Sequence, residues 1–158
     1  MRYDPSTMQR TAAAGYDSDF ALWAHEQAVA LRERRLADLD LEHIAEEMDG
    51  LASSERREIQ SRLKQIGAHL LKFEHQPERA TPSWRETIIE QADEIEAVLE
   101  ASPSLRREMP DFMARAYARA RRVASRETRL SLTTFPIAPT PEFERALHAA
   151  LAGEEFGF

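Results

Sequence analysis

The sequence contains no cysteine, few glycines and few aromatic residues. Without cysteine, the 158-residue chain has no disulfide, no thiolate metal ligand and no cysteine nucleophile, so its fold must be held by a core. The 5 glycines are scattered singly, and we find neither a glycine-rich phosphate loop nor a hydrolase triad motif. The remaining composition, 42% hydrophobic and 31% charged without strand-like alternation, is typical of a helix-rich globular protein.

Long apolar runs are missing as well. No segment approaches the ~18 apolar residues of a membrane span, and the N-terminal stretch MRYDPSTMQRTAAAG has no apolar run of signal-peptide length. We therefore expect a soluble, cytoplasmic protein without a membrane partner. The formal net charge of -7 makes nucleic acid an unlikely partner, because a phosphate backbone repels an acidic molecule.

Helical signals follow one another along most of the chain. Residues 1–15 show no periodicity, and we predict a flexible lead-in there, followed by a single domain over 16–158. Apolar periodicity and cap signals predict helices at 17–34, 41–50, 53–75, 83–101, 111–128 and 141–153. The clearest core stripe belongs to the third of these helices and contains Ile59, Leu63, Ile66, Leu70 and Phe73. The second helix has an apolar face formed by Leu41, Ile44, Ala45, Met48 and Leu51. In the first helix Gln27 is a polar residue within the apolar stripe, so it is either a structural hydrogen-bond node with polar partners or a boundary residue.

The ends of these helices carry recognisable signals. Gly50 is the expected hinge between the second and third helices, and Ser83 with Glu86 is the expected capping box of the fourth. The four longer helices have short connections, which favours antiparallel packing. The predicted fold is all-α: an antiparallel bundle of about four main helices, with a short second helix and a small C-terminal helix.

Several local patterns occur together in a specific order. They are YDSDFALWAHEQAVALRERR, DLDLEHIAEEMDGLASSERRE, HLLKFEHQPE followed by SWRETI, and SPSLR leading to ARRVASRETRL and TFP. In this order, between Tyr16 and Thr134, the chain resembles the bacterial family known only as domain of unknown function 29. The resemblance implies an all-helical, soluble, bacterial protein and carries no activity. It also marks His69, Lys72, Trp84 and Arg85 as typical of the pattern, without giving them a role.

Metal binding is the first chemistry to weigh in a helical bundle. A di-metal carboxylate site requires Glu-x-x-His motifs, and none of the 5 histidines has a glutamate three residues before it. A looser set contains His43 and Glu47, one turn apart, with His69 from the next helix. A histidine–carboxylate hydrogen bond that fixes one helix on the other explains these residues more simply, so we predict no metal and no cofactor.

A basic ridge lies on the fifth predicted helix. Its members recur at spacings of four, three and four, which places them on one face: Arg115, Arg119, Arg122 and Arg126. Six acids with no base among them lie between Glu86 and Glu100, so we expect the ridge to pair within the chain. The alternative is an anionic ligand, a nucleic acid or an acidic protein surface.

Two hypotheses for function follow. The first is a non-enzymatic helical interaction module that acts through protein contacts, either with a partner protein or by self-association. The alternative is a small-molecule or metal-dependent site between the second, third and fourth helices, with His69 as acid/base or ligand and Glu47 as its carboxylate partner. In that site Lys72 and Arg85 form the anion-binding pair, and Trp84 shares the cleft. No residue is assigned as catalytic.

Overall fold

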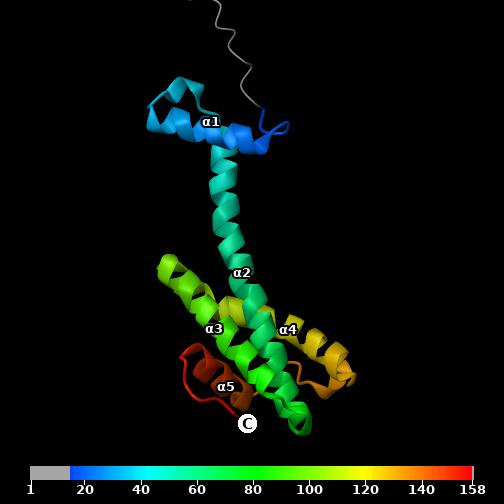
Figure 1. The fold of residues 1–158 in the computed structure, drawn as a ribbon. Coiled ribbons are helices and arrows are strands. Elements are labelled where there is room, and N and C mark those ends of the chain that lie inside the picture. The colour runs from blue at the N-terminus through cyan, green and yellow to red at the C-terminus, as the bar shows by residue number, and fades with distance from the viewer. Residues whose placement is uncertain (1–14, 158) are drawn as a thin grey trace, which may run out of the picture. The chain divides into compact units, whose positions relative to one another are not determined.

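The described part of the chain consists of α-helices joined by short 3-10 helices and loops. The computed structural model describes residues 15–157, so residues 1–14 of the predicted lead-in lie outside the described residues. Figure 1 shows the five α-helices: α1 (Phe20–Arg32), α2 (Leu41–His75), α3 (Pro82–Ala101), α4 (Met109–Thr128) and α5 (Pro141–Leu151). Short 3-10 helices lie at Leu36–Asp38, Pro77–Arg79, Pro103–Glu108 and Leu132–Thr134. With no strand among the described residues, the predicted all-α class is confirmed.

Internal contacts divide the chain into two compact units. Unit 1 is Met1–Leu51 and unit 2 is Ala52–Phe158, so the boundary falls inside α2. Each unit is described by itself below. That residues 16–158 act as a single domain stays a prediction.

Gly50 does not end a helix. The expected hinge is wrong, because α2 runs without a break through Gly50. A glycine that ends a helix usually has a positive φ. Positive φ angles occur instead at Arg34, Arg129 and Gly153, each just beyond a helix. A single glycine inside a helix costs only about 1 kcal/mol relative to alanine, and helical residues continue on both sides of it.

Proline decides where α3 begins. The expected capping box at Ser83 and Glu86 is also wrong, because the N-cap is Thr81 and Pro82 is the first helical residue. Proline is suited to this position, since its fixed φ is helical and its missing N–H has no partner there. Ser83 therefore lies inside the first turn, where its hydroxyl contacts that of Thr81 at 2.8 Å.

Unit 2 contains the hydrophobic core. The predicted stripe is confirmed at Ile59, Leu63, Ile66 and Leu70, whose exposed fractions do not exceed 2%. Figure 1 shows α3, α4 and α5 gathered around the C-terminal part of α2, and each supplies apolar residues to one cluster. From α4 these are mostly small residues at four-residue spacing, namely Ala116, Ala120 and Ala124.

Gly67 allows α2 and α4 to approach closely. A Cβ atom built at this glycine would lie 2.9 Å from Cβ of Ala120 and 3.6 Å from Cζ of Phe143. Ala120 is fully buried, and its methyl group has no rotamer that would relieve the contact. The glycine is therefore required by packing and not by turn geometry.

Unit 1 has a very small core. In Figure 1, α1 crosses the first turns of α2. Among residues 15–51 only Trp23, Gln27 and Ala30 are buried. Hydrogen bonds between side chains, described next, hold these two helices together.

Candidate functional site

Trp84 is the centre of a charged and aromatic cluster in unit 2. Nζ of Lys72 lies 4.3 Å from the centre of the Trp84 ring and 2.8 Å from Oε2 of Glu127. Lys72 is only 8% exposed, and a charge so far removed from water requires such partners. The ring of Phe73 also meets Trp84 edge to face, with ring centres 5.4 Å apart. Lys72 is thus satisfied inside the protein and offers no free charge to an anion.

His69 borders the same tryptophan. Its Nδ1 donates a hydrogen bond to the carbonyl oxygen of Gln65 at 2.9 Å, and its ring meets Trp84 edge to face. Burial lowers the pKa of His69, and the nearby Lys72 charge lowers it further, despite the opposing hydrogen bond to Gln65. His69 is therefore uncharged at neutral pH and serves to pack α2 against α3.

Glu47, the predicted partner of His69, belongs to unit 1 and binds a different residue. Its Oε1 accepts a hydrogen bond of 2.5 Å from the hydroxyl of Tyr16. The expected pairing of His69 with Glu47 is therefore wrong. The backbone carbonyl of Gln65 and the hydroxyl of Tyr16 satisfy the two residues separately.

Arg85 ties α3 to the C-terminal segment. Its Nη1 donates to the carbonyl oxygen of Phe156 at 3.0 Å, and its guanidinium carbon lies 4.7 Å from the Phe156 ring centre. A cavity of about 200 Å³ adjoins this contact, lined by Phe73, Pro77, Arg85, Phe156 and Gly157. Lys72 and Arg85 do not act as a pair, because Lys72 is bound to Glu127.

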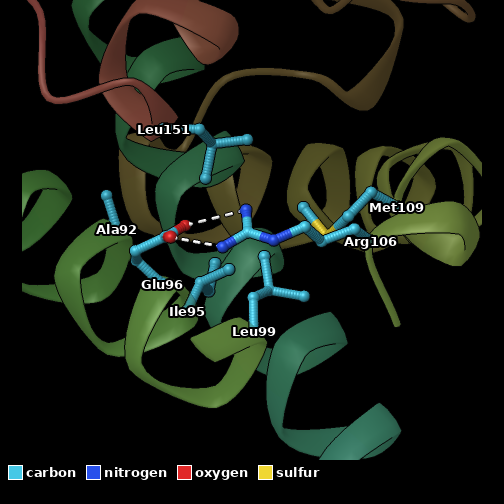
Figure 2. A pocket seen from close by; sticks show the side chains of 7 residues that line it. All are labelled: Ala92, Ile95, Glu96, Leu99, Arg106, Met109 and Leu151. Carbon is cyan, nitrogen blue, oxygen red and sulfur yellow. Dashed lines mark hydrogen bonds and ion pairs between the residues drawn. The ribbon is translucent and has the colours of Figure 1, made fainter. Parts of the chain in front are cut away.

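A second cavity of about 200 Å³ lies between α3, α5 and the beginning of α4. Figure 2 shows its lining side chains, with the guanidinium of Arg106 facing the carboxylate of Glu96 between Leu151 and Leu99. This ion pair lowers the pKa of Glu96 and raises that of Arg106. The polar groups of this cavity thus satisfy each other.

The basic ridge of α4 is unpaired. All four of its arginines are exposed, and none forms a hydrogen bond or ion pair with another described residue. The expectation of pairing with the acids of α3 is wrong, because two of these acids have other partners. Glu94 pairs with Arg62 from α2, and Glu96 pairs with Arg106. The ridge faces outward, away from the buried alanines of α4.

Unit 1 contains a polar frame that sequence reasoning missed. Asp40 caps α2 and accepts hydrogen bonds from His43 Nδ1 at 2.7 Å and from Trp23 Nε1 at 3.3 Å. Its own N–H donates to Oε1 of Gln27 at 2.8 Å. Gln27 is thus a buried hydrogen-bond node. The sequence signal was a polar residue inside an apolar stripe, but nothing in the pattern identified Asp40 as its partner.

Tyr16 completes this frame. Its ring stacks on His43 with centres 4.1 Å apart, and its hydrogen bond to Glu47 is the first of several influences that raise its pKa to about 12. The frame links the segment before α1, α1 itself and the first turns of α2. Its polar contacts leave much of the apolar surface of unit 1 uncovered.

The titration of His43 tests the frame directly. The hydrogen bond to Asp40 raises the pKa of His43 above 6.5 and lowers that of Asp40 below 3.8. The His43 contribution to stability is therefore full below pH 6.5 and lost as pH rises through its raised pKa, whereas that of Asp40 is lost as pH falls through its lowered pKa. We expect an NMR titration to give a His43 pKa above 6.5 that falls in Asp40→Asn.

The matched control is Asp38→Asn. Asp38 lies only two residues before Asp40, but it pairs with Arg35 and not with a residue of the polar frame. This substitution should leave the His43 pKa unchanged. An equal fall in both variants would show that general charge, and not the Asp40 hydrogen bond, sets the pKa of His43.

Apolar side chains are exposed mainly in unit 1. Among residues 15–157, seven of the ten exposed large apolar residues lie there, namely Phe20, Leu22, Leu31, Leu36, Leu41, Met48 and Leu51. On α2 they form a row at spacings of three, four and three, consisting of Leu41, Ile44, Met48 and Leu51. We call this row the α2 stripe. Leu41, Met48 and Leu51 are 67%, 58% and 61% exposed, although the sequence pattern suggested a buried face.

Two further properties describe residues 15–157. No three histidine, cysteine, aspartate or glutamate side chains among them converge in a way that would hold a metal ion. None of the helices in this range is long and apolar enough to cross a membrane.

These features define an all-α protein in which several partly buried polar side chains join one helix to another. The chain belongs to the family described as Domain of unknown function DUF29, whose model matches residues 16–151. The resemblance noted from the sequence motifs is thereby confirmed. No curated protein and no solved structure matches the chain.

Proposed function

We propose that this protein is a non-enzymatic interaction module that binds another protein segment through the α2 stripe. The observation that carries the proposal is the exposure of Leu41, Met48 and Leu51 on adjacent turns of one helix. Monomeric proteins expose single apolar residues commonly, but contiguous apolar patches mark sites of association. Residues at the spacing of the α2 stripe lie on one helical face, which is how helices present anchors to a partner.

The polar frame supports this proposal by explaining how the stripe stays available. Hydrogen bonds accepted by the side chains of Asp40, Gln27 and Glu47 hold α1 and the segment before it against α2, so the stripe is not needed for that contact. The alternative, a small-molecule site centred on His69, has less support. Its proposed members are each engaged elsewhere, with His69 on Gln65, Lys72 on Glu127 and Glu47 on Tyr16.

Photo-crosslinking in the cells that make the protein tests the proposal. A photoreactive phenylalanine at the exposed Ala45 position, beside the stripe, is expected to give a discrete protein adduct. The adduct should be lost when Leu41→Ser and Met48→Ser are added, because both remove apolar contact surface. The same probe at Ile137, which is 89% exposed in unit 2, is the control. Equal adducts at both positions, or an adduct that survives the serine substitutions, would contradict the proposal.

A further inference from the structure

Carboxylates lie along one border of the α2 stripe and on the far side of the same helix. At about 100° of rotation per residue, Asp40 and Glu47 lie beside the stripe, whereas Glu42, Glu46 and Asp49 lie on the opposite side of α2. The last three are exposed, whereas Asp40 and Glu47 are partly buried in the polar frame. No lysine or arginine occurs between Leu36 and Glu55 to offset them. The acidic residues in this part of the chain therefore give the surroundings of the stripe a negative charge that no lysine or arginine offsets.

The remainder of unit 1 is negatively charged as well. Residues 15–51 contain ten acidic and three basic residues, a formal charge of -7 that equals the charge of the whole chain. Residues 52–158 contain seventeen acidic and sixteen basic residues and are nearly balanced. Charges within the Debye length, about 8 Å at physiological salt, are screened only in part, so a partner bound to the stripe interacts with this negative charge.

We infer that the partner of the α2 stripe is an amphipathic helix whose apolar face is flanked by lysine or arginine. This inference rests on the proposed function and adds the chemistry of the partner. Spacings of three and four are those of heptad a and d positions, which receive side chains from a facing helix. Basic residues at the flanking positions of that helix meet the border formed by Asp40 and Glu47, and the wider negative charge of unit 1 favours such a partner.

The same charges argue against a second copy as the occupant. Two α2 stripes packed on each other would bring together two copies of residues 15–51, each with a formal charge of -7. Like charges across an interface oppose association. The stripe also covers only three helical turns, from Leu41 to Leu51, which is short for a self-sufficient coiled coil.

Three synthetic peptides of about 20 residues test the inference, a length at which helix formation in water is feasible. All three carry leucine at heptad a and d positions, and their flanking positions carry lysine, glutamine or glutamate. Binding is measured by fluorescence anisotropy at low and high salt with the full chain. We expect the lysine peptide to bind at least about tenfold more tightly than the glutamate peptide, with a difference that shrinks as salt rises.

The double variant Leu41→Ser with Met48→Ser separates stripe binding from general attraction to an acidic protein. Its affinity for the lysine peptide should fall at least about tenfold, whereas Ile137→Ser should bind as the unaltered protein does. Both stripe residues are exposed, so circular dichroism should show the helices intact. Equal binding of the lysine peptide by the double variant would show charge attraction alone and overturn the inference.

The remaining outcomes distinguish this inference from the proposed function. If all three peptides bind equally and all depend on Leu41 and Met48, the partner chemistry is wrong while the interaction module stands. If light scattering shows a dimer that the serine substitutions dissociate, a second copy is the occupant and the basic helix is excluded. If no peptide binds through the stripe and the crosslinking at position 45 also fails, both proposals are wrong.

Discussion

Replacing Phe135 by alanine is expected to destabilise unit 2 by about 3–5 kcal/mol, the range measured for deleting a buried aromatic side chain. Phe135 is 1% exposed although it lies in the irregular connection between α4 and α5. Its ring meets His75 edge to face at 4.9 Å, and its carbonyl oxygen accepts a hydrogen bond from Arg121 at 2.8 Å. Alanine keeps the backbone hydrogen bond and leaves a cavity where the ring was.

The neighbouring Ile137 provides the control. It is 89% exposed, so Ile137→Ala should change the free energy of unfolding by less than about 0.5 kcal/mol. Native-state hydrogen exchange at Ile66 and Leu70 measures both variants, because these fully buried residues report opening of the unit 2 core. A loss below about 1 kcal/mol for Phe135→Ala would mean that the connection is not anchored by this ring.

Substituting the two glycines of α2 by alanine is expected to give opposite results. At Gly67 a new Cβ would meet Cβ of Ala120 at 2.9 Å, so the helices must separate and unit 2 should lose about 1–3 kcal/mol. At Gly50 no atom lies within 4 Å of the new Cβ, so alanine should stabilise the helix by about 0.5–1 kcal/mol. Urea unfolding followed by circular dichroism and hydrogen exchange measures both changes.

A compensating substitution separates the contact from other effects of Gly67→Ala. Adding Ala120→Gly removes the methyl group that clashes, so the double variant should recover part of the stability lost by the single one. Recovery is incomplete because a glycine in α4 itself costs about 1 kcal/mol. If the effects of Ala120→Gly and Gly67→Ala on the free energy of unfolding simply add, the new methyl group at position 67 does not clash with that of Ala120.

Sequence patterns predicted some parts of this structure correctly and others wrongly. Helical periodicity correctly predicted the all-α class and the core face of α2 from Ile59 to Leu70. Periodicity is a local property, since it reports which side chains share a face of one helix. It does not report what covers that face. The same kind of pattern at Leu41, Met48 and Leu51 is therefore exposed, against expectation.

The candidate site shows the same limit. The sequence suggested that Gln27 needs a polar partner and that His69 lies at a helix contact, and both residues do hold helices together. Their actual partners depend on how the chain returns on itself. Asp40 meets Gln27 because α1 crosses the start of α2, and Gln65 satisfies His69 within its own helix.

By itself the sequence determined the helices, most of their apolar faces and the absence of cysteine chemistry, because these follow from residue type and from spacing along one element. Tertiary structure alone decided three other matters. It made Gly67 a packing requirement and left open space beside Gly50, it buried Phe135 in a connection, and it left the four ridge arginines of α4 without partners among the described residues. Each depends on the distance between elements that are far apart in the chain. The spacing of residues along a single helix gives no information about that distance.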